Sequence, residues 1–307
     1  MSLSRWGVSP YETEADIQAE AQQLAEWVEV QAPGVDAEIV VVHSKIRFGL
    51  AQLERAPSCR LLITTTSGTD HIDLQAMAAA GVTVCRLPLA RRDAVVETAL
   101  MMMLWGLRAA GPMQEAAQAG QWVRGDLPSL NMRLLGGARV GLLGLGVIGA
   151  RMAQVLLGLG AQVLGCDPAG VPDGVQSAPL EALLECDVLS LHCDLNASSE
   201  RIIGPDALVS AASGLVLVNT ARGGLVDVAS AVAALGQGRL GAVCLDVFEE
   251  APYPELARAA QVPRVMLLPH AAGFHVGLPA AIRQGLSVAV ASWCAGEAVP
   301  HRVSRSG

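Results

Sequence analysis

Short apolar runs alternate with helix-like stretches along most of the chain. In the first third, the pattern predicts strands over residues 38–43, 60–65 and 82–85 and a helix over residues 73–80. From residue 139 onward it predicts strands over residues 139–143, 162–166, 188–192, 215–219, 241–246 and 265–268, with helices over residues 149–159, 180–184 and 229–235. Strands that alternate with helices predict an α/β fold in which helices cover parallel sheets on both faces.

One predicted helix is far more apolar than the others. It covers residues 94–111 and contains Met101, Met102, Met103, Leu104 and Trp105. Because its apolar surface is so wide, we expect the helix to be buried nearly all round. The alternative is a helix at a domain junction or a dimer interface, since methionine-rich faces suit both places.

Composition supports buried sheets and excludes two classes of protein. Of the 307 residues, 52% are apolar and 16% are charged, which excludes a disordered chain. The longest uninterrupted apolar stretch has about ten residues, whereas a membrane span needs roughly 20, so we expect no membrane association. No signal peptide is expected either. The apolar content comes from Ala, Val, Leu and Gly, as in strands that are buried on both faces.

The net charge and the cysteines indicate which binding partners and which cellular compartment to expect. The formal net charge is -8 and Lys45 is the only lysine, so we expect no nucleic-acid partner. The seven cysteines are scattered, odd in number and never spaced C-x-x-C. This usage predicts free thiols in a reducing compartment, and therefore a cytoplasmic protein.

A glycine motif follows the strand predicted over residues 139–143 and opens the next helix. Gly144, Gly146 and Gly149 form G-x-G-x-x-G, with Val147 and Ile148 between the second and third glycines as further cofactor-binding candidates. The first glycine permits a tight turn, the second lets the backbone approach a pyrophosphate, and the third lets helix and strand pack closely. The N–H groups at the helix start then face the phosphates. The context predicts a dinucleotide site.

A carboxylate and the position of the motif refine this prediction. Asp167 ends the next strand, near the usual spacing of about 20 residues for a group that binds the adenosine ribose, and its charge favours NAD over NADP. A motif near residue 144 is late, so an α/β domain precedes it. We predict a substrate domain over residues 1–93 and 275–307 and an NAD-binding Rossmann domain over residues 94–274.

Five ordered motifs resemble the D-isomer-specific 2-hydroxyacid dehydrogenase family. They are the glycine motif and residues 66–73, 219–224, 245–248 and 269–273, so the resemblance runs from about residue 43 to residue 273, while the first 35 residues match poorly. It implies a substrate domain built from both chain ends and an NAD domain inserted between them. Both domains would be Rossmann-like or flavodoxin-like, and the protein would form a homodimer. It also implies hydride transfer between NAD and a 2-keto or 2-hydroxy acid.

Two residues suit this chemistry on their own terms. Arg222 follows a strand and precedes two glycines, so its guanidinium fork suits a substrate carboxylate and the adjacent oxygen. His270 follows an apolar strand, and an imidazole that titrates near neutrality suits transfer of the alkoxide proton. The alternatives are that Arg222 is an ordinary surface arginine and that His270 has only a structural role.

The resemblance assigns further site residues. Gly68 and Thr69 match the loop whose N–H groups hold the substrate carboxylate, and His43 falls on a loop that faces the substrate. Thr220 and Ala221 fall among the cofactor-binding residues, and Asp246 matches a position near the nicotinamide carboxamide. For Asp246 the alternative is a helix or turn cap.

The sequence departs from the family pattern where a glutamate usually supports the catalytic histidine. Here that position is Ala251. Without a carboxylate partner the pKa of His270 is expected to fall. Three interpretations stay open: a weaker acid with a more acidic optimum, support from Glu250 or another carboxylate, or a chain that binds NAD with little turnover.

Two smaller departures concern charge. Asp194 replaces a common proline near the expected nicotinamide edge. Arg91 and Arg92 replace a neutral segment, and either recognise a second acidic group on the substrate or are solvated or dimer-contacting. The main hypothesis is an NAD-dependent 2-keto acid reductase. The alternatives are an NAD-binding regulatory protein and a dehydrogenase for formate- or phosphite-like anions.

Overall fold

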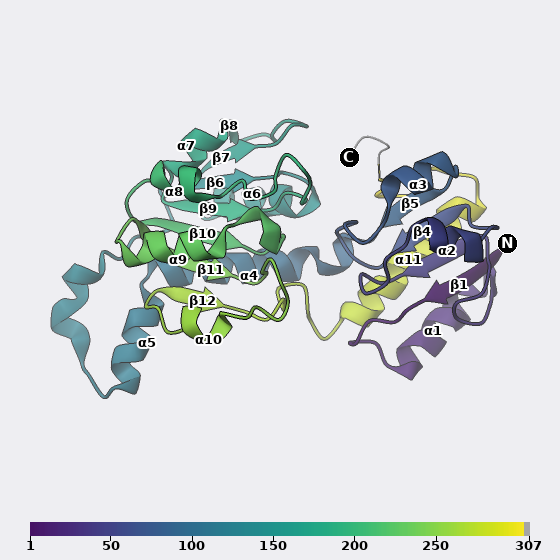
Figure 1. Ribbon diagram of the computed structural model, residues 1–307, viewed down its shortest axis with the longest axis horizontal. Helices are drawn as coiled ribbons and strands as arrows, with labels where there is room; N and C mark the ends of the chain where they lie inside the picture. The colour runs from purple at the N-terminus through teal and green to yellow at the C-terminus, as the bar shows by residue number, and fades with distance from the viewer. Residues whose placement is uncertain (304–307) are drawn as a thin grey trace. The chain divides into compact units, whose positions relative to one another are not determined.

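The computed structural model describes residues 1–303 and divides into two compact units (Figure 1). Unit 1 combines Met1–Arg91 with Phe274–Gly307, and unit 2 is Arg92–Gly273. These divisions lie within two residues of the boundaries drawn from the sequence. Each unit contains one parallel sheet.

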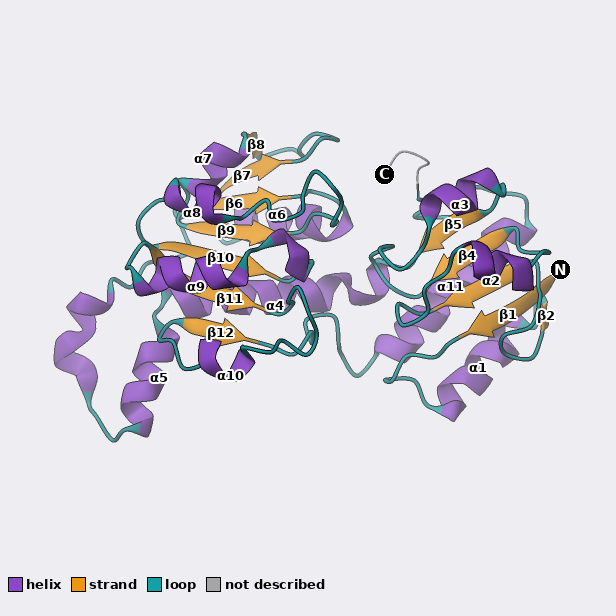
Figure 2. Cartoon of the chain, viewed as in Figure 1, coloured by secondary structure: helices purple, strands orange, loops and turns teal. Residues whose placement is uncertain are grey.

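Unit 1 has a five-stranded sheet in the order β2-β1-β3-β4-β5 (Figure 2). Its strands are β1 Ser2–Trp6, β2 Glu29–Val30, β3 Ile39–Val42, β4 Leu61–Thr64 and β5 Thr83–Arg86, and its helices are α1 Glu14–Leu24, α2 Leu50–Arg55, α3 Leu74–Ala79 and α11 Leu278–Cys294. Ile39 and Val41 pack with α1 and α11, whereas Val40 and Val42 pack with α3 on the other face. Helices therefore cover both faces of the sheet.

Unit 2 has a seven-stranded sheet in the order β12-β11-β10-β9-β6-β7-β8. Its strands are β6 Arg139–Leu143, β7 Gln162–Cys166, β8 Gln176–Ser177, β9 Val188–Leu191, β10 Leu215–Asn219, β11 Leu240–Leu245 and β12 Val265–Leu267. Its helices include α6 Val147–Gly158, α7 Leu180–Leu184, α8 Pro205–Val209, α9 Val228–Gly236 and α10 Leu256–Ala259. The chain order reverses between β6 and β9, and ligands of such sheets bind beside this switch point.

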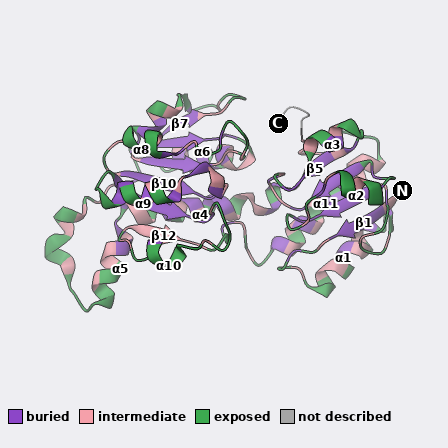
Figure 3. Cartoon of the chain, viewed as in Figure 1, coloured by how far each residue is buried: buried purple, intermediate pink, exposed green. Residues whose placement is uncertain are grey.

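The apolar helix differs from its prediction. It is α4 Leu89–Leu107, which starts earlier than expected, directly after Pro88. It ends earlier as well, because Ala109 adopts a left-handed φ of 49° before α5 Ala110–Gln118, and the 3-10 segment η1 Val123–Leu130 follows. The expectation of nearly complete burial is wrong. Met102 and Met103 are fully buried, but Met101 is 45% and Leu104 38% exposed, because only one stripe of the helix faces the core (Figure 3).

The start of the chain was not anticipated from the sequence pattern. Residues 2–6 form β1, which lies between β2 and β3, and Leu3 is buried. Arg5 on this strand is also buried, and it pairs with Glu12 and Glu20. A charged residue inside the strand hides its apolar pattern.

The cysteines are free thiols, as predicted. Burial raises the pKa of the Cys59 and Cys85 thiols to about 12, so both stay protonated near neutrality. Of the described helices, no single one is long and apolar enough to cross a membrane; the bent pair α4 and α5 passes that test only jointly, by length and composition.

Candidate active site

The three glycines of the loop after β6 differ in their surroundings. Gly144 has a φ of +91°, which favours glycine, and a Cβ there would collide with the backbone of Cys193. A Cβ at Gly149 would collide with the carbonyl oxygen of Gly144. Gly146 differs, because a Cβ there would meet nothing within 4 Å. The first and third glycines thus serve packing, while the second leaves open space above the N-terminus of α6, which begins with Val147 and Ile148.

Asp167 lies beside this loop, directly after β7. Its Oδ2 accepts from the Leu145 N–H at 2.6 Å and its Oδ1 from the Ala169 N–H at 2.8 Å. A carboxylate has about four lone-pair positions, so both oxygens retain capacity for ribose hydroxyls. The charge that is predicted to favour NAD therefore borders the loop expected to receive the pyrophosphate.

Thr220, which directly follows β10, carries a buried hydroxyl group. Its hydroxyl is buried after β10 and, within residues 1–303, has no hydrogen-bond partner. A buried hydroxyl without a partner costs stability, and a ligand oxygen or nitrogen would relieve that cost. The orphan hydroxyl and the open space at Gly146 fit a dinucleotide bound at this edge of the sheet.

Arg222 is held by its own loop. Asn219, at the end of β10, accepts from the Ala221 N–H at 3.0 Å and donates to the Arg222 carbonyl at 2.8 Å. The Arg222 guanidinium donates to the Ala221 carbonyl at 2.7 Å and is partly exposed. A Cβ at Gly223 would collide with the backbone of Phe248, so glycine is required where this loop meets the segment after β11.

Asp246 holds the loop that carries His270. Its carboxylate oxygens accept from the N–H groups of Ala271 at 2.7 Å and Ala272 at 2.9 Å, and its carbonyl accepts from the His270 N–H at 2.8 Å. His270 has a φ of 58° and is exposed. The structure therefore places Asp246 in the turn-capping role, and burial raises the pKa of its carboxyl group.

Asn219 connects the two predicted catalytic residues. Its carbonyl accepts from the Asp246 N–H at 2.9 Å, while its side chain bonds the Arg222 loop. Asn219 and Asp246 thus join the loops of Arg222 and His270 through adjacent parallel strands. Asn219 opens the motif over residues 219–224, and the sequence pattern gave it no role. The available signal was a polar residue at the end of a fully apolar strand.

The segment around Ala251 supplies no partner to His270. Glu249 pairs with Arg201 at 3.3 Å, and Glu250 is exposed. Within the part of the chain that the structure describes, the His270 imidazole makes no ion pair with a carboxylate. The interpretation in which Glu250 supports His270 is not observed.

The substrate-loop residues lie in unit 1. A hydroxyl chain shapes this loop: the Thr64 hydroxyl lies 3.0 Å from His71 Nε2 and 2.9 Å from the Thr66 hydroxyl, which donates to the Gly68 carbonyl at 3.0 Å. Across residues 1–303, the N–H groups of Gly68 and Thr69 have no acceptor. This leaves both N–H groups available to a ligand.

The remaining charged candidates have distinct surroundings. His43 is buried, and burial together with the charge of Arg91 lowers its pKa to about 4. Arg92 pairs with Asp93 at 2.9 Å, whereas Arg91 donates to the Thr65 carbonyl. The carbonyl of Asp194 accepts from the Ser199 hydroxyl at 2.8 Å.

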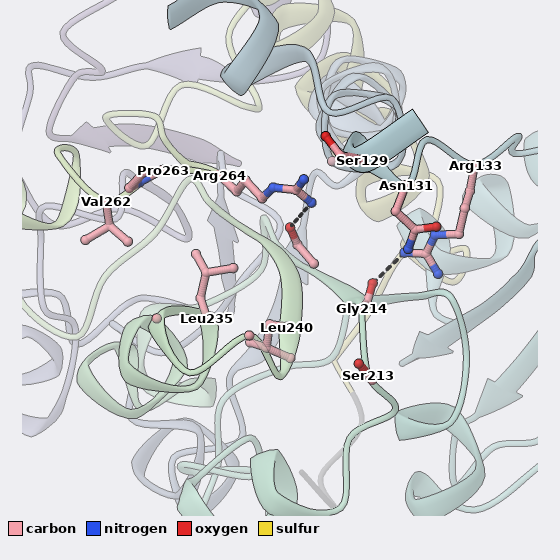
Figure 4. Close-up of a pocket in the computed structure, with 14 residues that line it drawn as sticks. Ser129, Asn131, Arg133, Ser213, Gly214, Leu235, Leu240, Val262, Pro263 and Arg264 are labelled. Carbon is pink, nitrogen blue, oxygen red and sulfur yellow. Dashed lines mark hydrogen bonds between the residues drawn. The ribbon is translucent and has the colours of Figure 1, made fainter. Parts of the chain in front are cut away.

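A separate hollow of about 510 Å³ in unit 2 lies away from these loops (Figure 4). Gly214, Leu240 and Arg264 line it at the amino ends of β10, β11 and β12, opposite the predicted site. Arg133 in its wall pairs with Asp187 at 2.7 Å, and Arg264 donates to the Leu130 carbonyl at 3.3 Å. The arginines therefore tie η1 and the segment after it to the sheet.

Two parallel α/β units, one with a dinucleotide loop at its switch point, define the class of two-domain nucleotide-binding proteins. Comparison with known proteins makes this specific. Residues 100–272 match the D-isomer specific 2-hydroxyacid dehydrogenase NAD-binding domain. The chain belongs to this family, which confirms the predicted family, fold class and NAD cofactor.

Individual relatives show how far the similarity extends. A D-lactate dehydrogenase from Curvularia clavata is 34% identical over 222 residues, covering 71% of this chain and 63% of that protein. A hydroxypyruvate reductase from Thermotoga maritima is 30% identical over 240 residues, covering 76% of this chain and 78% of that protein. The chain thus matches less than two thirds of the length of the first relative.

A solved structure supports the fold over the whole chain. An acyclic imino acid reductase in complex with NADPH and D-Arg has a TM-score of 0.85 and 20% identity, and the match covers 99% of this chain and 100% of that chain. At this identity the likeness concerns the fold alone.

Proposed function

We propose that the protein is an NAD-dependent oxidoreductase that interconverts a 2-keto acid and a D-2-hydroxy acid. The observation that carries this proposal is the hydrogen-bond link from the Arg222 loop through Asn219 and Asp246 to the His270 loop. It joins the loop of Arg222 after β10 to the loop of His270 after β12, at the edge of the sheet that carries the glycine loop.

Each residue has a defined task in the reduction. When bound, NADH supplies the hydride that adds to the C2 carbon of the keto acid. Arg222 binds the carboxylate and the C2 oxygen through its fork, which orients the substrate and stabilises the charge that develops on that oxygen. His270 donates its imidazole proton to the same oxygen, so the products are the hydroxy acid and NAD. The N–H groups of Gly68 and Thr69 bind the carboxylate.

The test is NADH oxidation with glyoxylate, pyruvate, hydroxypyruvate and bulkier 2-keto acids. We expect turnover that falls as pH rises, since His270 must be protonated to act as the acid. Absence of turnover with every acid at all pH values between about 5 and 8 would exclude the proposal.

A second candidate is an NAD-binding regulatory protein, and Ala251, which stands where the family usually has a glutamate, favours it. The variant Ala251→Glu separates the two functions, because it restores a carboxylate at the position where the family has one. A gain in kcat shows that the remaining site is competent. NADH binding without turnover in both proteins supports the regulatory function.

We also propose a homodimer in the cytoplasm. The exposed Met101 and Leu104 on α4 and the exposed Trp122 support an apolar contact, and the unreactive free thiols suit a reducing compartment. Sedimentation measurements test the assembly: a single species with the mass of one 31.8 kDa chain at micromolar concentration would exclude the dimer.

A further inference from the structure

Arg91 and Arg92 are consecutive, yet their side chains have different environments. Arg92 pairs with Asp93 at 2.9 Å near the surface, and Arg151 joins the same carboxylate at 3.3 Å. Arg91 instead belongs to unit 1, where its guanidinium donates to the carbonyl of Thr65. That carbonyl belongs to the segment just after β4, three residues before Gly68. Arg91 therefore borders the loop that is proposed to bind the substrate carboxylate.

Arg91 has no carboxylate of its own among residues 1–303. The carboxylate that acts on it, Glu12, is already engaged, since both of its oxygens accept from Arg5 at 2.7 Å and one also accepts from the Ser9 N–H. Burial affects Arg91 more than Glu12 does and lowers its pKa. A half-buried guanidinium bonded to a neutral carbonyl lacks the counter-charge that such groups normally have.

Other polar groups in this part of unit 1 can donate hydrogen bonds. His43 lies close enough for the charge of Arg91 to act on it, and its Nδ1 accepts from the Lys45 N–H at 3.4 Å. A neutral imidazole with an accepting Nδ1 carries its hydrogen on Nε2, which can donate. The hydroxyls of Thr65 and Ser67 are buried and have no partner in the described part of the chain. A cation with several free donors suits an anionic ligand group.

We infer that Arg91, with His43 beside it, binds a second anionic group on the substrate. The preferred substrates are then 2-keto acids that carry a carboxylate or a phosphate on the side chain. This inference rests on the proposed function, in which Arg222 and the Gly68–Thr69 loop bind the carboxylate next to the keto group. Arg91 is a specificity-determining residue, while the proton-transfer step remains with His270.

Matched pairs of substrates test this inference. We compare kcat/KM for 2-oxoglutarate with 2-oxopentanoate, oxaloacetate with 2-oxobutyrate, and 3-phosphooxypyruvate with hydroxypyruvate. The first two pairs test a carboxylate and the third tests a phosphate. We expect the wild type to prefer the member with the extra charge by at least tenfold in one pair. Preference for the singly charged acid in all three pairs overturns the inference.

Two variants at Arg91 and one control at the neighbouring Arg92 test whether Arg91 causes the substrate preference. Arg91→Gln is expected to lower kcat/KM for the doubly charged substrate about 10- to 100-fold, mainly through KM, and to remove the preference. Arg91→Lys keeps the charge without the fork and restores part of the preference. Arg92→Gln is the matched control and should change kcat/KM by no more than twofold for either substrate. An equal loss for both members of a pair in Arg91→Gln overturns the inference.

Binding measurements separate failure of this inference from failure of the proposed function. If no 2-keto acid is reduced, the proposed function fails, and calorimetry with 2-oxoglutarate in the presence of NADH decides the role of Arg91. Binding that weakens at least tenfold in Arg91→Gln and not in Arg92→Gln supports it. Equal binding in all three proteins, or no binding to the wild type, overturns it. Thermal unfolding shows whether each variant folds, and Arg91→Lys replaces Arg91→Gln if that variant does not.

Discussion

Asp246 shows how one buried carboxylate can position a reactive side chain that it does not need to contact. Both of its oxygens accept backbone N–H groups from the two residues after His270. In Asp246→Asn, the amide group turns an acceptor into a donor that faces an N–H group, so one bond is lost. We expect the free energy of unfolding to fall by about 1–3 kcal/mol and kcat to fall roughly 10- to 100-fold.

Chemical denaturation and steady-state kinetics measure both effects of Asp246→Asn. Asp227→Asn is the control, because Asp227 caps α9 by accepting from the Ser230 N–H at 2.9 Å and asparagine caps helices as well as aspartate. The control should keep near wild-type stability and kcat. A stable Asp246→Asn variant with wild-type kcat would contradict the positioning role.

Thr220 offers a prediction in which stability and binding change in opposite directions. Thr220→Val removes a buried hydroxyl that has no partner in residues 1–303 and keeps the shape of the side chain. We expect unfolding to cost about 1 kcal/mol more and NADH to bind roughly 3- to 10-fold more weakly, because the free protein loses an unsatisfied group and the complex loses a hydrogen bond. Thermal unfolding and calorimetry measure the two changes. Thr220→Ser, which retains the hydroxyl, should bind NADH like the wild type.

For single residues, the sequence predicts a role where that role follows from the residue type and its spacing in a motif. The three glycines of the dinucleotide loop are of this kind, because turn, open approach and close packing each require the absence of a side chain. The split between Arg91 and Arg92 is different. Two adjacent arginines are equivalent in sequence, and only tertiary contacts direct one to Asp93 and the other to Thr65.

The β6–loop–α6 element carries a prediction about two glycines three residues apart. Gly149→Ala forces a methyl group against the Gly144 carbonyl, whereas Gly146→Ala places it in open space. Gly149→Ala should therefore reduce the free energy of unfolding by about 2–4 kcal/mol. Gly146→Ala should fold normally but bind NADH at least tenfold more weakly, because the methyl group would occupy the approach of the pyrophosphate. Denaturation and calorimetry on both variants provide the test; equal stability losses would contradict it.

Strands were easier to predict than the ends of the apolar helix. β6, β7 and β10 have the predicted bounds, since buried parallel strands read as apolar runs between polar turns. β1 was missed because Ser4 and Arg5 interrupt its pattern, and their polar groups are satisfied by residues outside the strand. The end of α4 depends on the left-handed Ala109, a conformation that the residue type does not signal.

Across the whole molecule, each unit contains a histidine whose lowered pKa makes that unit sensitive to acid. Burial and the nearby charge of Arg91 lower the pKa of His43 in unit 1 to about 4, and burial lowers that of His192 in unit 2 to about 4. The ordinary pKa is about 6.5, so between about pH 6.5 and 4 the unfolded chain binds protons that the folded chain does not. Stability must therefore fall as pH falls through this window.

Each histidine is expected to lower the free energy of unfolding by about 1–3 kcal/mol as the pH falls from about 7 to 4.5. Glu20 and Asp246 act in the opposite direction, because burial raises the pKa of each carboxyl group and their protonation favours the folded state. Thermal unfolding between pH 7.5 and 4.5 measures the net slope, and His43→Gln and His192→Gln should each flatten it. Because the two histidines occupy different units, their effects should add. A melting temperature that stays constant from about pH 7 to 4.5 in the wild type, or slopes that neither variant changes, would show that these histidines do not govern the acid sensitivity of the fold.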